Sequence, residues 1–174
     1  MRFLAPIILL CAISSVNAQI KSDWERANEE RLKQSQEQLV PPPSLDKARL
    51  VEVKSTLAAD TDFRFFVDPD SVSVGEDRIV RYVLVSRSPS GSESITFEGI
   101  RCPGEYRVYA VGHADGTWAG RPSEWRTIVR DPRVSQATLA RQYFCPGRSA
   151  ILTNAEGQKA VRAGGHPGVI TDQR

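Results

Sequence analysis

Alternating apolar and polar residues predict a chain built mainly of β-strands from about residue 44 onward. The segments with this pattern are residues 50–53, 63–67, 79–86, 94–100 and 105–111. The third is the strongest prediction, because β-branched and aromatic residues fill most of it. Turn-forming residues separate the segments at 68–71, 88–91, 103–104 and 115–116. The pattern therefore predicts an antiparallel sheet.

The central hairpin of this sheet has two competing registers. With residues 88–91 as the loop, Tyr82 lies opposite Phe97 and Arg81 lies opposite Glu98, so that one face is apolar and the other is mixed. A shift by one residue sets Tyr82 against Glu98 and removes this separation. The first register is therefore the predicted one.

Helices are predicted after the strands. Asp131 followed by Pro132 favours a helix that runs to about residue 144, although residues 134–145 also leave a strand open. Asn154 is the predicted N-cap of a last short helix, which a glycine pair ends. Residues 166–174 are predicted to be a flexible tail.

The first residues of the chain predict export. Arg2 precedes an uninterrupted apolar stretch, and Val16 and Ala18 are compact enough for a signal-peptidase cut after Ala18. The stretch is too short to span a bilayer stably. Residues 1–18 are therefore the predicted signal peptide. We expect a periplasmic protein, and the pattern leaves a cell-surface location open.

Residues 19–43 are predicted to be an exposed helix followed by a linker. Ser22 and Glu25 have the spacing of a capping box, and the residues after them form only a thin apolar face. Three consecutive prolines, Pro41 to Pro43, then favour an extended spacer. The folded domain is predicted to span residues 44–165.

Two cysteines remain once the signal peptide is removed, namely Cys102 and Cys145. An even number of cysteines in an exported chain predicts a disulfide between them. They do not form a Cys-x-x-Cys motif, and no histidine stands near either of them at the spacing of metal ligands. The sequence therefore predicts no metal site and no cofactor.

The charge balance limits the choice of partners. The chain has 23 Lys and Arg against 21 Asp and Glu, and this nearly even balance gives no reason to expect nucleic acid as a partner. Arginine accounts for 17 of the 22 basic residues of the mature chain. Arg81 and Arg107 are therefore candidate anion-binding residues on a sheet face, since a guanidinium suits carboxylate and phosphate. The alternative is a solvated surface rich in arginine.

Signs of catalysis are few. The sequence has neither a Gly-x-Ser-x-Gly motif nor a phosphate-binding loop. The enzyme hypothesis is a small envelope hydrolase that uses His113 with a nearby carboxylate, Asp115 or Glu98. We expect instead a protein without catalytic residues.

Four motifs give the chain a family resemblance over roughly residues 44–165. They are Phe65-Phe66-Val67-Asp68-Pro69-Asp70-Ser71, Arg81-Tyr82-Val83-Leu84-Val85, Glu98-Gly99-Ile100-Arg101-Cys102 and Tyr143-Phe144-Cys145-Pro146. With these motifs the chain resembles the CNP-one-like family of exported Gram-negative proteins. The resemblance implies a single envelope domain and no particular activity.

A looser likeness is to the surface-adhesin protein E family. It is carried by Asp68, Ser71, Cys102, Trp125 and Cys145. This likeness implies an antiparallel sheet with a helix attached by a disulfide.

Together, the patterns predict an α+β fold. It consists of a single antiparallel meander of about five to six strands, a C-terminal helix docked on it and tied by one disulfide, and a loosely attached N-terminal helix. The expected function is non-catalytic binding or scaffolding in the envelope. The partner would be an envelope protein or an anionic cell-wall or lipid component.

Overall fold

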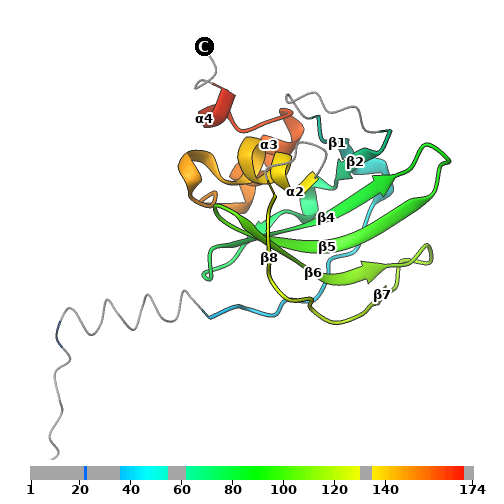
Figure 1. Ribbon diagram of the computed structural model, residues 1–174, viewed down its shortest axis with the longest axis horizontal. Coiled ribbons are helices and arrows are strands. Elements are labelled where there is room, and N and C mark those ends of the chain that lie inside the picture. Colours follow the sequence, from blue (N-terminus) through cyan, green and yellow to red (C-terminus); the bar gives the residue numbers. More distant parts are fainter. Residues whose placement is uncertain (1–21, 23–35, 55–61, 130–134, 171–174) are drawn as a thin grey trace, which may run out of the picture.

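A computed structural model of the chain describes residues 22, 36–54, 62–129 and 135–170. One antiparallel sheet forms the centre, and the C-terminal helices cover one of its faces (Figure 1). The exposed helix predicted after Ser22 lies outside the described residues, as do residues 171–174 of the predicted tail 166–174; within that tail, Pro167–Ile170 form a short helix, α4.

Within the described residues the sheet has eight strands. They are β1 (Val51–Glu52), β2 (Arg64–Val67), β3 (Ser73–Val74), β4 (Ile79–Arg87), β5 (Glu93–Arg101), β6 (Glu105–Gly112), β7 (Trp118–Ala119) and β8 (Arg126–Thr127). Strands β2 and β3 both pair with β4, and β7 and β8 both pair with β6. β5 already occupies the other edge of β4 and of β6. Strands β2 and β3 therefore share the place next to β4 in the strand order, and β7 and β8 share the place next to β6. The eight strands therefore fill six positions, as the meander prediction requires.

The predicted register of the central hairpin is wrong by one residue. In the structure, Tyr82 lies opposite Glu98, and Val83 lies opposite Phe97. The prediction assumed that only one face of the hairpin is buried, but β4 is buried on both faces from Ile79 to Val85. Because both faces of the hairpin are covered, apolar residues are accommodated on either side, and a register that collects them on one face has no advantage.

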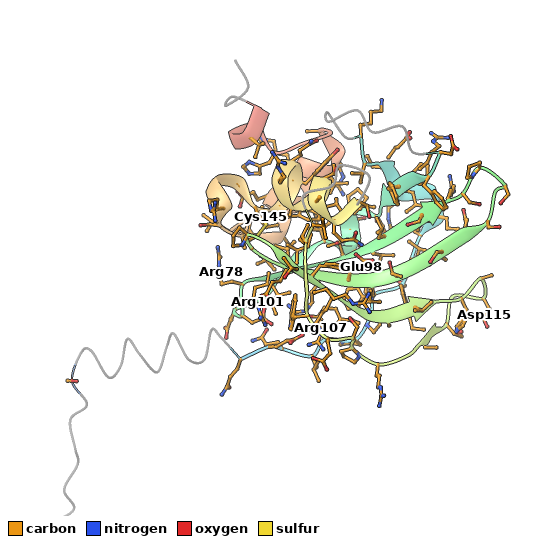
Figure 2. The ribbon with its side chains drawn as sticks, in the orientation of Figure 1. Arg78, Glu98, Arg101, Arg107, Asp115 and Cys145 are labelled. Carbon is orange, nitrogen blue, oxygen red and sulfur yellow. A yellow bond between two sulfur atoms is a disulfide. The ribbon has the colours of Figure 1, made fainter. Side chains whose placement is uncertain are left out.

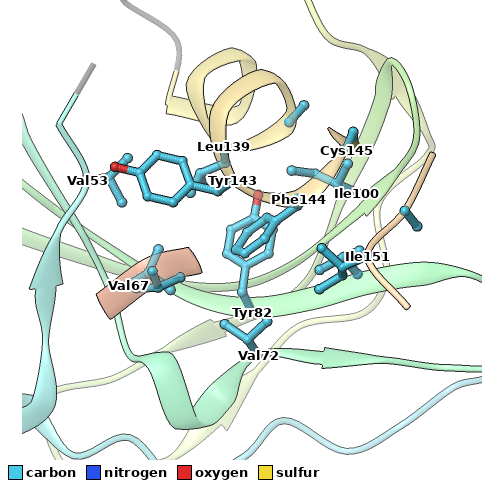
Figure 3. Packing of buried hydrophobic residues seen from close by; sticks show 14 of the residues in the cluster. Val53, Val67, Val72, Tyr82, Ile100, Leu139, Tyr143, Phe144, Cys145 and Ile151 are labelled. Atoms are coloured by element: carbon cyan, nitrogen blue, oxygen red, sulfur yellow. The ribbon is translucent and has the colours of Figure 1, made fainter. Parts of the chain in front are cut away.

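Each face of the sheet has its own apolar core. On the helix side, Tyr82 packs against Phe144 with ring centroids 5.2 Å apart, and Val67, Ile100 and Leu139 surround them (Figure 3). On the opposite side, a smaller cluster contains Phe66, Val83, Val85, Ile95, Phe97, Tyr109 and Ala110. Leu45, Leu50 and Trp118 cover part of this second cluster.

The segment before Cys145 is helical, which settles the choice that the sequence left open. It begins as α2 (Ser135–Thr138) and continues as a π-helical turn, η3 (Leu139–Phe144). The backbone N–H of Cys145 closes this turn on the carbonyl of Ala140 at 2.9 Å. Both sides of η3 are buried, which explains why its apolar residues did not form a single stripe.

The remaining helices are short. They are η1 (Lys47–Arg49), η2 (Pro69–Ser71), η4 (Pro146–Arg148), α3 (Asn154–Arg162) and α4 (Pro167–Ile170). Helix α3 is capped by Thr153, whose hydroxyl accepts from the backbone of Glu156, one residue before the predicted cap. The side chain of Asn154 instead accepts the backbone N–H of Val74 and attaches α3 to the sheet.

Contacts with the sheet begin earlier in the chain than the predicted boundary at residue 44. Residues 37–43, called the strap below, run across the face opposite the helices (Figure 1). At one end the Glu37 carboxylate accepts from the hydroxyl of Tyr109, and at the other the Pro43 carbonyl accepts from the indole of Trp118. Part of the predicted linker is therefore docked on the domain.

Candidate functional site

The disulfide joins the sheet to the helical layer. Cys102 follows the last residue of β5, and Cys145 follows η3; their Cα atoms are 5.7 Å apart. This confirms the predicted pairing and the helix tied to the sheet. Figure 2 shows Cys145 at the opposite end of the sheet from Asp115.

The structure brings the two candidate arginines onto the same face. Arg81 of β4 and Arg107 of β6 both pair in register with Gly99 of β5, so they flank it in one cross-strand row. A Cβ atom on Gly99 would lie 2.6 Å from the Tyr109 ring. Glycine at this position therefore allows Tyr109 to lie over the strand between the two arginines.

Arg81 is not part of an exposed surface, contrary to the sequence expectation. It is 1% exposed and pairs with Asp77, with Nη2 and Oδ2 2.5 Å apart. Its guanidinium also donates to the carbonyls of Gln38 and Ile79. Burial opposes ionisation of Asp77, but the hydrogen bond from Arg81 and two backbone donors outweigh it, so the pKa of Asp77 is lowered.

Arg107 takes part in a three-donor site for a carboxylate. Its Nη1 lies 2.6 Å from Oε2 of Glu37, which also accepts from Nε1 of Trp125 at 3.1 Å. The Tyr109 hydroxyl donates to Oε1 of the same carboxylate at 2.7 Å. Burial raises the pKa of Glu37, yet these donors outweigh it and the pKa lies below its ordinary value. The site is thus built to hold an ionised carboxylate.

Arginines and aromatic rings alternate around this carboxylate. The Arg81 guanidinium lies 5.4 Å from the Tyr109 ring, and that of Arg107 lies 5.6 Å from Tyr109 and 5.3 Å from Trp125. Arg101 lies 4.2 Å from Trp125 and ends the series (Figure 2). Each contact is within the range of a cation–π interaction. We call these five residues the arginine–aromatic row.

Two of the three residues of the enzyme hypothesis, His113 and Asp115, lie in the same turn, and Glu98 lies apart from them. Asp115 accepts from the backbone and the hydroxyl of Thr117, and these bonds lower its pKa and hold it in the β6–β7 turn. Glu98 is 3% exposed, and its side-chain partners are Tyr82, Thr96 and Gln136. His113 lies in the same turn as Asp115: its backbone N–H donates to the carbonyl of Thr117 at 2.8 Å, and both residues line a pocket of about 260 Å³. Glu98 is further away, because Gly112, the residue before His113, pairs with Ile95, roughly 10 Å along β5 from Glu98.

Glu98 has a pH-dependent effect that a substitution can measure. Burial raises its pKa above the ordinary 4.5 despite three hydrogen bonds, so the folded state holds its proton more tightly than the unfolded state. The resulting loss of stability develops as pH rises above 4.5. We therefore expect Glu98→Gln to raise the melting temperature at pH 7–8, with a gain that disappears as pH falls to about 4.5.

Glu93→Gln is the matched control for this prediction. Hydrogen bonds from Lys47 and Arg87 lower the pKa of Glu93, so its contribution is present at neutral pH and is lost as pH falls. Its substitution should therefore slightly lower the melting temperature at pH 7–8. Melting curves of both variants from pH 4 to 8 test the pair. A gain from Glu98→Gln that does not vary with pH would contradict the assignment.

A pocket of about 560 Å³ lies beside the disulfide, and no sequence motif indicates it. Its wall includes the apolar side chains of Ile128, Ala137, Ala140 and Val169. Arg141 and Arg148, both exposed, also line it. No acidic side chain of the described residues pairs with either one, whereas the ion pairs of seven other arginines are formed.

The region around His166 adjoins this pocket. His166 donates its backbone N–H to the carbonyl of Gln142, and its ring lies 2.9 Å from the carboxylate of Glu156. Gly168, two residues further on, lines the pocket. Within the ranges that the structure describes, no three His, Cys, Asp or Glu side chains are grouped to hold a metal ion, and no helix is long and apolar enough to span a membrane.

The fold and these sites define a small α+β domain with one antiparallel sheet, a disulfide to its helical layer and an arginine-rich face. Residues 24–163 match the model of the CNP1-like family, the family that the four sequence motifs resemble. The chain therefore belongs to the CNP1-like family. No curated protein and no solved structure matches the chain. The looser likeness to the protein E family stays a prediction.

Proposed function

We propose that the protein is an exported, non-catalytic binding domain of the Gram-negative envelope, most simply in the periplasm. Two features support export: the signal-peptide pattern of residues 1–18, which lie outside the described residues, and the disulfide, since such bonds persist in oxidising compartments. Glu98 is buried apart from His113, and the Asp115 carboxylate is already held by Thr117, so we favour binding over hydrolysis.

The pocket beside the disulfide is the proposed binding site. The observation that carries this proposal is that Arg141 and Arg148 line an apolar pocket without an acidic partner among the described residues. Arg81 and Arg107, by contrast, already hold the carboxylates of Asp77 and Glu37. We propose that the pocket takes an anionic group, a carboxylate or a phosphate, together with an apolar part of the same envelope component.

Charge reversal tests this site. The mature protein is sedimented with vesicles containing phosphatidylglycerol and, separately, with peptidoglycan sacculi, which distinguishes a phosphate source from a carboxylate source. We expect binding to one of them to weaken at least tenfold in the Arg141→Glu/Arg148→Glu variant. Binding should also weaken as the salt concentration rises from about 50 to 300 mM, because exposed charges are screened.

Arg121→Glu/Arg126→Glu is the control, because both arginines are exposed and neither lines the pocket. It changes the net charge equally and should leave binding within about twofold of the wild type. If both double variants lost binding equally, the effect would come from the overall charge, and the proposal that the pocket is the binding site would be contradicted. Fractionation of cells tests export separately: the mature product should begin at Gln19 and appear outside the cytoplasm.

A further inference from the structure

The strap contacts the sheet as a bound peptide would, through one side chain in a specific site and through hydrogen bonds of its backbone. Its first side chain, Glu37, lies in the three-donor carboxylate site described above. The next residue is held by its backbone: the N–H of Gln38 donates to Asp77 at 2.7 Å, and its carbonyl accepts from Arg81 at 2.5 Å. The groups that recognise the strap here thus belong to the sheet and the turn before it.

Few apolar side chains of the strap are buried. Leu39 is 74% exposed and Val40 is 40% exposed. A hollow of about 270 Å³ beside them is lined also by the half-buried Trp118, so some aromatic surface remains accessible next to the strap. Since apolar burial is the main source of binding free energy, the strap is held largely by polar contacts that another peptide can reproduce.

The sheet face beneath the strap also has more hydrogen-bond donors than the strap uses. The Nε–H groups of Arg81 and Arg107 are buried and have no hydrogen-bond partner among the residues that the structure describes. Buried donors are nearly always paired, and each unpaired one costs free energy. The Arg81 side chain is 1% exposed, and that of Arg107 is 14% exposed. A ligand with additional acceptors would therefore gain contacts that the strap does not make.

We infer that this face is a binding groove for an acidic peptide segment of a partner protein, and that the strap occupies it when no partner is bound. The partner segment places a Glu or Asp carboxylate between Arg107, Tyr109 and Trp125. Asp77 and Arg81 then hold its next peptide group. The groove lies on the opposite side of the sheet from the pocket beside the disulfide, so the two proposals stand on separate residues.

A peptide added in trans tests the groove. The probe is a fluorescein-labelled peptide with the sequence of residues 34–43, and the protein is the mature chain carrying Glu37→Lys. The lysine is repelled by Arg107, so its own strap no longer competes. We expect this variant to bind the probe at least tenfold more tightly than the wild type, measured by fluorescence anisotropy. A probe with Gln in place of its Glu should bind at least tenfold more weakly.

Glu124→Lys provides the matched control, because Glu124 is exposed and makes no ion pair that the structure describes. This variant should bind the probe no better than the wild type. Equal binding of the Glu and Gln probes, or no binding to a folded Glu37→Lys variant, would overturn the inference.

Hydrogen exchange of the wild type provides a second test that does not depend on the folding of the variant. If the strap opens by itself, the Gln38 amide exchanges at least a hundredfold faster than the Val83 amide, which lies in the centre of the sheet and donates to Ser71. Exchange of both amides at the rate of global unfolding would mean that the strap is a permanent part of the domain, and the inference would fail.

Discussion

Loss of the Cys102–Cys145 disulfide is expected to lower the melting temperature by roughly 10–20 °C. The bond closes a chain loop with a sequence separation of 43 residues. For a loop of this size the entropy of the unfolded chain accounts for about 4 kcal/mol, a large part of the roughly 5–15 kcal/mol that stabilises a domain. Calorimetry of the wild type with and without reductant measures the effect.

The double variant Cys102→Ser/Cys145→Ser serves as the control for this experiment. It should melt near the temperature of the reduced wild type, and reductant should leave it unchanged. Because the bond ties η3 to the sheet, limited proteolysis of the variant should cut first within the C-terminal segment that begins at residue 131. A shift of less than about 2 °C on complete reduction would show that packing alone holds this segment.

Asp77→Asn is expected to destabilise the domain by about 3–5 kcal/mol. Both side chains of the Asp77–Arg81 pair are 1% exposed, so the substitution removes the carboxylate that pairs with a buried guanidinium. The expected loss of stability is as large as that from removing the disulfide, although the substitution only replaces one carboxylate oxygen by an amide nitrogen. Chemical denaturation of the wild type and the variant at pH 7 gives the difference in the free energy of unfolding.

Two further variants separate the charge from the position. Glu52→Gln removes a carboxylate that is 32% exposed and also pairs with an arginine, Arg64, and it should cost no more than about 1 kcal/mol. Asp77→Leu combined with Arg81→Met removes both charges and should be more stable than Asp77→Asn alone. If Asp77→Asn costs less than about 1 kcal/mol, Arg81 has found another acceptor and the pair is not required.

The sequence was sufficient for the sheet and the disulfide because both follow from local patterns. β-Branched runs and turn residues mark the strands, and two cysteines outside the predicted signal peptide leave one pairing. The predicted register of the hairpin is wrong because the register depends on which elements cover each face of the hairpin. Neither the helices on one side nor the strap on the other can be placed from the residues of the hairpin, and Tyr82 opposite Glu98 looks unfavourable without Gln136 and Thr96 nearby.

The same limit explains what was missed at the sites. Arg81 and Arg107 lie on one face and each pairs with a carboxylate of the chain itself, so binding of an external anion by them stays a prediction. Glu37 is 70 residues from Arg107, and its sequence context of glutamines and prolines predicts a linker. The pocket beside the disulfide requires α4, η3 and β8 to meet, and no motif in the sequence encodes that meeting.

The edge strands of the sheet are short, and this helps the folded chain to avoid aggregation. Its three long strands, β4, β5 and β6, have eight or nine residues each and all lie in the interior of the strand order. At the outer positions, β1, β7 and β8 have only two residues each. So short a row of free amides and carbonyls gives another molecule little to pair with. The folded domain is therefore poorly suited to seed intermolecular strand addition, even when many copies are crowded together.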